Sequence, residues 1–171
     1  MIRVSIREQI QNFIVLLLIQ LPLVHRIVLF DKAFAFFYIG FLLMLPATLS
    51  RTYLMLIAFG SGLLVDVFSN TPGIHAGVSV FIMFVRNFWL RGVNDDYLQL
   101  VNINMETLKK SGFLYFIFPL VLIHHFLIFT IENGGFQYLG MLMTKVVFST
   151  AFTCTVIFVI NFVFTPKSRR K

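Results

Sequence analysis

Apolar residues fill six stretches of the chain, and short polar or charged segments separate them. The stretches cover about residues 10–25, 33–50, 53–69, 74–91, 113–131 and 138–164. A helix that crosses a bilayer needs roughly 20 mainly apolar residues, and these stretches approach that length. The pattern predicts an all-α fold, a polytopic membrane protein with about six transmembrane helices in one transmembrane domain.

The composition agrees with a chain that lies in a bilayer. Hydrophobic residues make up 58% of the chain, charged residues make up 12%, and the mean hydropathy is +0.89. A water-soluble domain carries about twice this share of charge. Six spans use nearly all of the 171 residues, which excludes most enzymes with a separate catalytic module. The single cysteine, Cys154, excludes an intramolecular disulfide.

The basic residues indicate an orientation, because Lys and Arg favour the cytoplasmic side of a membrane. With a cytoplasmic N-terminus and alternating helices, Arg26 and Lys32 lie outside and Lys145 lies within a span. The other eleven of the 14 basic residues are then cytoplasmic: Arg3, Arg7, Arg51, Arg86, Arg91, Lys109, Lys110, Lys167, Arg169, Arg170 and Lys171. This asymmetry predicts that both termini are cytoplasmic, and it explains the net charge of +7 without a nucleic-acid partner.

Residues 92–112 form the only long connection between the apolar stretches. Leu98, Val101, Met105 and Leu108 recur there at spacings of 3, 4 and 3, which places them on one face of a helix. Two acidic residues precede this pattern and two lysines follow it, as helix ends prefer. We expect a cytoplasmic interfacial helix that binds a partner through these four residues; a solvated loop is the alternative.

Several polar residues fall within the predicted spans, where a charged group costs at least about 2.5–3.5 kcal/mol. Asp66 and Lys145 lie at matching depths in the outer half, so a buried pair is one arrangement that the sequence allows. His75, His124 and His125 lie in the same half, and His75 shares a helix face with Ser79 and Arg86. A metal site, a proton relay and a structural polar network are the alternatives. We favour the network, because no His-x-x-x-His or Glu-x-x-His pair is present, and we assign no catalytic residue, cofactor or metal.

Residues 60–77 carry the most specific local pattern, a glycine-rich helix end followed by a turn. Gly60, Ser61 and Gly62 allow close helix approach, as do Gly73, Ala76 and Gly77 on the next helix. Thr71, Pro72 and Gly73 provide turn chemistry. Asp66 lies just before this turn, and we expect its carboxylate to accept hydrogen bonds from the turn amides as a structural latch.

This hairpin resembles the MreD family, small integral membrane proteins of bacterial rod-shape determination. The matching residues are Gly62, Leu63, Leu64, Asp66, Thr71, Pro72 and Gly73, whereas Ile74 and His75 depart from the family pattern. Gln20-Leu21-Pro22 and Leu45-Pro46-Ala47 are further similarities. The resemblance covers nearly the whole chain, although its specific part is about 20 residues.

The resemblance implies a non-enzymatic scaffold subunit of the cell-elongation machinery in the bacterial inner (cytoplasmic) membrane. The implied partners are an MreC-like membrane protein, MreB, RodA and a class B penicillin-binding protein, besides the lipid bilayer. The alternative is a small-solute-binding membrane subunit of an energy-coupling-factor type transporter. That function requires an outer cavity lined by polar residues, for which the candidates are Asp66, His75, His124, His125 and Lys145.

Overall fold

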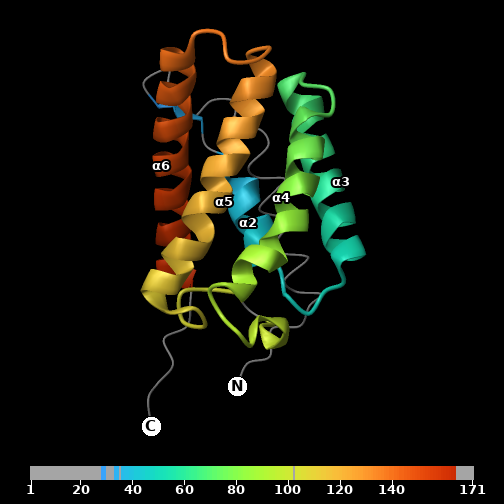
Figure 1. Ribbon diagram of the computed structural model, residues 1–171, viewed down its shortest axis with the longest axis vertical. Helices are drawn as coiled ribbons and strands as arrows, with labels where there is room; N and C mark the ends of the chain where they lie inside the picture. The colour runs from blue at the N-terminus through green and yellow to red at the C-terminus, as the bar shows by residue number, and fades with distance from the viewer. Residues whose placement is uncertain (1–27, 30–32, 35, 102, 165–171) are drawn as a thin grey trace.

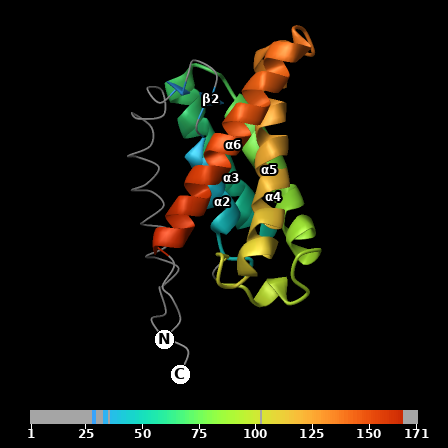
Figure 2. The ribbon, with the colours of Figure 1, turned by 90° about the vertical axis from the view of Figure 1, so that its left-hand side faces the viewer.

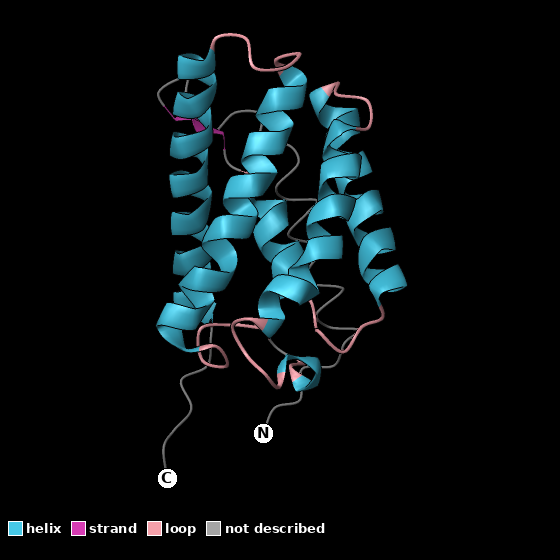
Figure 3. Cartoon of the chain, viewed as in Figure 1, coloured by secondary structure: helices cyan, strands magenta, loops and turns pink. Residues whose placement is uncertain are grey.

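The computed structural model describes residues 28–29, 33–34, 36–101 and 103–164. Apart from turns and loops, this part of the chain is helical except for a short antiparallel ladder, in which β1 (Val28–Leu29) pairs with β2 (Ala33–Phe34). Figure 1 and Figure 3 show long helices standing side by side, in the order α6, α5, α4 and α3, around the shorter α2. The fold is therefore an α-helical bundle with a short helix at its centre.

The long helices are α3 (Arg51–Ser69), α4 (Ile74–Arg91), α5 (Lys109–Glu132) and α6 (Leu139–Phe164). They correspond to the last four predicted apolar stretches, whose helical structure is confirmed. Of the described helices, α3, α5 and α6 are long and apolar enough to cross a membrane. This result agrees with a membrane protein that contains transmembrane helices.

The second predicted span, 33–50, is only partly helical. Its helix, α2 (Phe37–Met44), has 8 residues and ends before Leu45, which is extended with ψ 148°. The reason is Pro46, because a proline disfavours the α conformation of the residue before it. The first predicted span, 10–25, lies outside the described residues.

Short as it is, α2 occupies the interior of the bundle. Its Tyr38, Ile39, Leu42 and Leu43 are buried, and the helix contacts each of the four long helices. Gly40 permits the contact with α6, since a Cβ at this position would lie 2.3 Å from a side-chain atom of Ile157. Figure 2 shows α6 inclined across the bundle with α2 beside it. Residues of α2 are thus placed to meet polar groups from several helices.

The predicted interfacial helix in 92–112 is wrong. Within the described part of this segment, one 3₁₀ turn, η1 (Tyr97–Gln99), is the only helical element before α5 begins at Lys109. Asn side chains explain the irregular backbone: Asn94 accepts a hydrogen bond from the amide of Asp96, and Asn104 accepts from those of Glu106 and Thr107. Such local bonds compete with helical ones.

The four apolar residues of this segment consequently do not share one face. Leu98 is 61% exposed and Val101 is 43% exposed, whereas Met105 and Leu108 are buried in the core. The amide of Met105 donates to Asn161 of α6, which fixes this end of the segment to the bundle. Leu98 and Val101 alone keep apolar surface available for a partner.

Candidate functional site

The carboxylate of Asp66 joins the end of α3 to the start of α4. Gly73, the residue before α4, has no side chain to cap that helix, and it adopts a positive φ of 82°. Asp66 supplies the cap instead: Oδ1 accepts from the amide of His75 and Oδ2 from the amide of Ala76, both at 2.9 Å. A carboxylate at a helix N-terminus also interacts favourably with the helix dipole. The predicted latch is therefore present, with amides of α4 rather than of the turn as its main donors.

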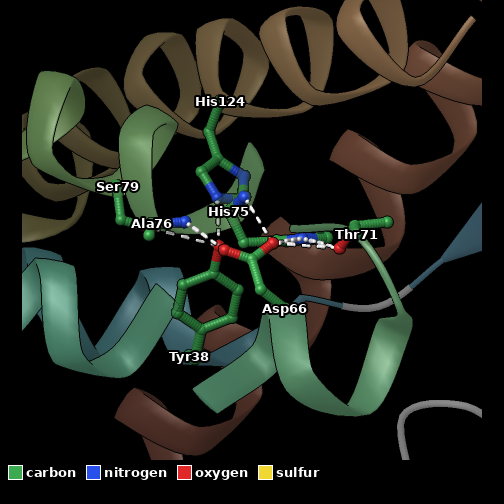
Figure 4. A network of polar contacts seen from close by, with 7 residues as sticks. All are labelled: Tyr38, Asp66, Thr71, His75, Ala76, Ser79 and His124. Carbon is green, nitrogen blue, oxygen red and sulfur yellow. Dashed lines mark hydrogen bonds and ion pairs between the residues drawn. The ribbon is translucent and has the colours of Figure 1, made fainter. Parts of the chain in front are cut away.

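Thr71 and His75 complete the environment of this carboxylate, which is 3% exposed. The Thr71 hydroxyl donates to Asp66 Oδ1 at 2.9 Å, and the Thr71 amide donates to the carbonyl of Asp66 at 3.1 Å. His75 Nδ1 lies 3.0 Å from the Thr71 hydroxyl and 3.1 Å from Asp66 Oδ1. Because the Thr71 hydrogen is already used, the network is satisfied when Nδ1 of His75 carries a hydrogen. Figure 4 shows these groups around Asp66.

Gly62 allows the backbones of α3 and α4 to touch just below the latch. A Cβ at Gly62 would lie 2.5 Å from Cα of Ala76 and 2.6 Å from its nitrogen, which is closer than real Cβ contacts. The prediction of close approach is thus confirmed for Gly62 and Ala76. It is wrong for Gly60, Gly73 and Gly77, where an added Cβ meets nothing within 4 Å.

A second group of bonds links α2, α4 and α5 through the hydroxyl of Tyr38. Ser79 donates to this hydroxyl at 3.2 Å, and the hydroxyl lies 2.8 Å from Nε2 of His124. Since Tyr38 has one hydrogen to give, it accepts from Ser79 and donates to His124. Figure 4 places this group beside the Asp66 latch, and all three side chains are buried.

His125 links α5 to α6. Its Nδ1 lies 2.8 Å from the carbonyl of Val121, and the hydroxyl of Thr153 lies 3.3 Å from its Nε2. The ring of Phe36 stands among the three histidines, at centroid distances of 5.0 Å from His75, 5.5 Å from His125 and 6.1 Å from His124. Within the described residues, no group of three or more His, Cys, Asp or Glu residues is arranged to hold a metal ion.

Arg86 has a structural role that the count of basic residues did not reveal. We expected a cytoplasmic basic residue, but its side chain is fully buried. Its Nε donates to the carbonyl of Leu43 at 2.9 Å, Nη2 donates to the carbonyl of Leu45, and Nη1 donates to Asn87 at 3.0 Å. The last carbonyls of a helix have no partner within the helix, and a cation is favourable there. The guanidinium thus satisfies the end of α2.

Lys145 lies apart from these networks. It lines a hollow of about 240 Å³ together with Glu132 and Asn133 at the junction of α5 and α6. The hydrogen bonds described for the Asp66 carboxylate come instead from Thr71, His75 and Ala76. In the described part of the chain, Asp66 therefore bonds within its own hairpin rather than with Lys145.

The site brings Gly62, Asp66, Thr71 and Gly73 together, as the hairpin pattern predicted, and it adds His75, which departs from the family pattern. His124 and His125 lie beside them, but Lys145 and the segment with Leu98 and Val101 do not. Tyr38 was not predicted. The sequence signal that could have identified it is that a tyrosine in an apolar stretch needs a hydrogen-bond partner when it is buried. Chemically, the arrangement orients helices and holds buried polar groups in fixed positions.

Comparison with protein-family models, curated proteins and solved structures finds no match to this chain.

Proposed function

We propose that this chain is a non-enzymatic membrane scaffold subunit of the bacterial cell-elongation machinery, similar to the MreD proteins. In this role it regulates cell shape and peptidoglycan synthesis through partner binding. The observation that carries the proposal is the hairpin. Asp66 bonds to Thr71 and to the start of α4, and Gly62 makes room for α4 beside α3. The residues that carry the resemblance therefore hold one hairpin together.

The proposed partners are an MreC-like membrane protein, MreB, RodA and a class B penicillin-binding protein. The exposed apolar side chains of Leu98 and Val101, in the connection between α4 and α5, offer one contact surface for them. Apolar side chains of α3 offer another, since Leu56, Phe59 and Val67 are also exposed. Contacts of this kind suit a scaffold that works through helix faces and short segments.

The alternative, a solute-binding subunit of an energy-coupling-factor type transporter, has less support. Its cavity needs polar side chains that face a solute. Asp66, His75, His124 and His125 are instead buried, each at 3% exposure or less, and make hydrogen bonds to protein groups. Lys145 lines the hollow at the junction of α5 and α6, whereas the hollow at the junction of α4 and α5 is lined by none of the five expected cavity residues.

The decisive experiment is purification of the tagged full-length chain in a gentle detergent, with the bound proteins identified by mass spectrometry. Recovery of a periplasmic coiled-coil membrane protein and of elongation enzymes is expected. Recovery of an ATPase module with a tightly held vitamin would overturn the scaffold in favour of the transporter subunit. A matched sample that carries Gly62→Ala should lose the partners, whereas Gly60→Ala should keep them.

For the topology, we propose a multi-pass arrangement in the inner membrane with both termini cytoplasmic. The basic residues support it: without Arg86, ten still fall in segments that the alternating arrangement assigns to the cytoplasm, against Arg26 and Lys32 outside. Replacement of Cys154, the only cysteine, provides a background for labelling single introduced cysteines. A cysteine placed after Lys171 should resist an impermeant reagent added outside, and its labelling there would contradict the topology.

A further inference from the structure

A hollow of about 470 Å³ lies where α4 ends and α5 begins. Trp89 and Tyr115 form one wall: their rings stack at a centroid distance of 6.2 Å, and the indole nitrogen donates to the carbonyl of Tyr115 at 3.2 Å. These contacts fix the wall. The hollow falls in the size range of small-ligand sites, and its lining residues are Phe88, Trp89, Arg91, Gly92, Asp95 and Tyr115.

The rim of the hollow carries one cation and one anion. Arg91 is the last residue of α4, and Asp95 follows within the next turn of chain. Both are exposed, and within the described part of the chain neither side chain makes an ion pair or a hydrogen bond. The two charges are therefore available to a ligand that carries a negative and a positive group of its own.

The surface that leads away from this rim is apolar. Phe81, Phe84 and Phe88 are exposed on α4 at spacings of 3 and 4, which places them on one helix face that ends at the hollow. Tyr115 adds an exposed ring from α5. Tryptophan and tyrosine are favoured where a membrane helix meets the headgroups. A ligand that matches this surface has charged groups at one end and a hydrocarbon chain at the other.

We infer that this hollow binds the headgroup of a zwitterionic phospholipid with a primary amine, that is, phosphatidylethanolamine. Arg91 holds the phosphate, Asp95 accepts hydrogen bonds from the ammonium group, and the acyl chains follow Phe88 and Phe84. A choline headgroup has no N–H to donate to Asp95, and a glycerol headgroup has no cation. The inference rests on the membrane placement in the proposed function, but not on the proposed partners.

Trp89 makes the test specific, because it is the only tryptophan in the chain. We suggest reconstituting the full-length protein in phosphatidylcholine bilayers and adding phosphatidylethanolamine with brominated acyl chains, which quench nearby tryptophan. Quenching should saturate with phosphatidylethanolamine, and brominated phosphatidylglycerol or phosphatidylcholine should bind roughly threefold to tenfold more weakly, as expected for the loss of a charge-assisted bond.

Substitutions test which headgroup charge is bound by Asp95 and which by Arg91. Asp95→Asn should abolish the preference for the ethanolamine lipid, and Arg91→Gln should weaken all three lipids by a similar factor. The matched controls are Asp96→Asn and Arg51→Gln, exposed residues outside the hollow, and they should leave binding unchanged.

Among the results that would overturn the inference, three come from the quenching and substitution measurements. They are quenching that never saturates, equal quenching by all three lipids, and equal weakening by Arg91→Gln and Arg51→Gln. If soluble phosphoethanolamine displaced the lipid at the same concentration as a short-chain lipid does, the hollow would bind a soluble ligand. This result would contradict the lipid site. A wild-type protein that recovers its partners but shows no lipid preference would defeat this inference alone. A wild-type protein that shows the lipid preference but recovers no partners would defeat only the proposed function.

Discussion

At one end of α4 the chain turns back from α3 within residues 70–73, whereas at the other end it uses the whole segment 92–108 to reach α5. The short turn is held by a buried carboxylate, a glycine contact and a glycine with positive φ. The long segment is held by local Asn bonds and by buried side chains near its end, while Leu98 and Val101 stay exposed. One end of α4 is therefore fixed by buried polar contacts, whereas the other end leaves apolar side chains exposed.

The largest effect should come from removing the carboxylate at the short turn. Asp66→Leu leaves the amides of His75 and Ala76 and the hydroxyl of Thr71 without their acceptor. Each unsatisfied buried group costs about 1–3 kcal/mol, so a loss of several kcal/mol is expected in thermal unfolding of the purified protein. Asp96→Leu, at an exposed position in the long segment, is the matched control. An equal loss in both variants would remove the contrast between the two ends.

A smaller loss should follow Gly62→Ala. The added methyl group would lie 2.5 Å from the backbone of Ala76, and such overpacking costs about 1–3 kcal/mol or more. Gly60→Ala adds the same methyl group on the same helix into open space, so its stability should stay the same or rise slightly. Measurement of the unfolding temperatures of the two variants checks this prediction. An equal fall in unfolding temperature in both variants would contradict it.

The smallest effect is expected for Val101→Asp in the long segment. Because Val101 is 43% exposed, its stability change should stay within about 0.5 kcal/mol. Met105→Asp, only four residues later, buries a charge in the core and should unfold the segment. Limited proteolysis of the long segment separates the two outcomes. If Val101→Asp opens the segment as readily as Met105→Asp, Val101 is packed rather than exposed.

The short turn was predictable because its requirements are local. A Thr-Pro-Gly sequence specifies a turn, and an Asp just before it supplies an acceptor, so the latch follows from neighbouring residues. The identity of its donors was not predictable in the same way. They are the first amides of α4, which Gly73 leaves uncapped, and only the folded helix places them over Asp66.

The long-range contacts were not predictable from spacing. Tyr38 and His124 are far apart in sequence, as are Arg86 and the carbonyls at the end of α2, so no periodicity relates them. The interfacial helix failed for a different reason. Its apolar spacing was helical, but Asn94 and Asn104 bind the backbone locally, and the pattern was too short to outweigh them.

The most direct test of the central claim, that Asp66 is a structural latch in a partner-binding scaffold, compares Asp66→Asn with Asp66→Leu in one set of purifications. Asparagine keeps one acceptor oxygen, so thermal stability and partner recovery should both fall in the order wild type, Asp66→Asn, Asp66→Leu. If Asp66 carried protons instead, partner recovery should be lost equally in both variants, because neither asparagine nor leucine titrates. Equal loss of partner recovery in both variants, with folding intact in both, would contradict the latch.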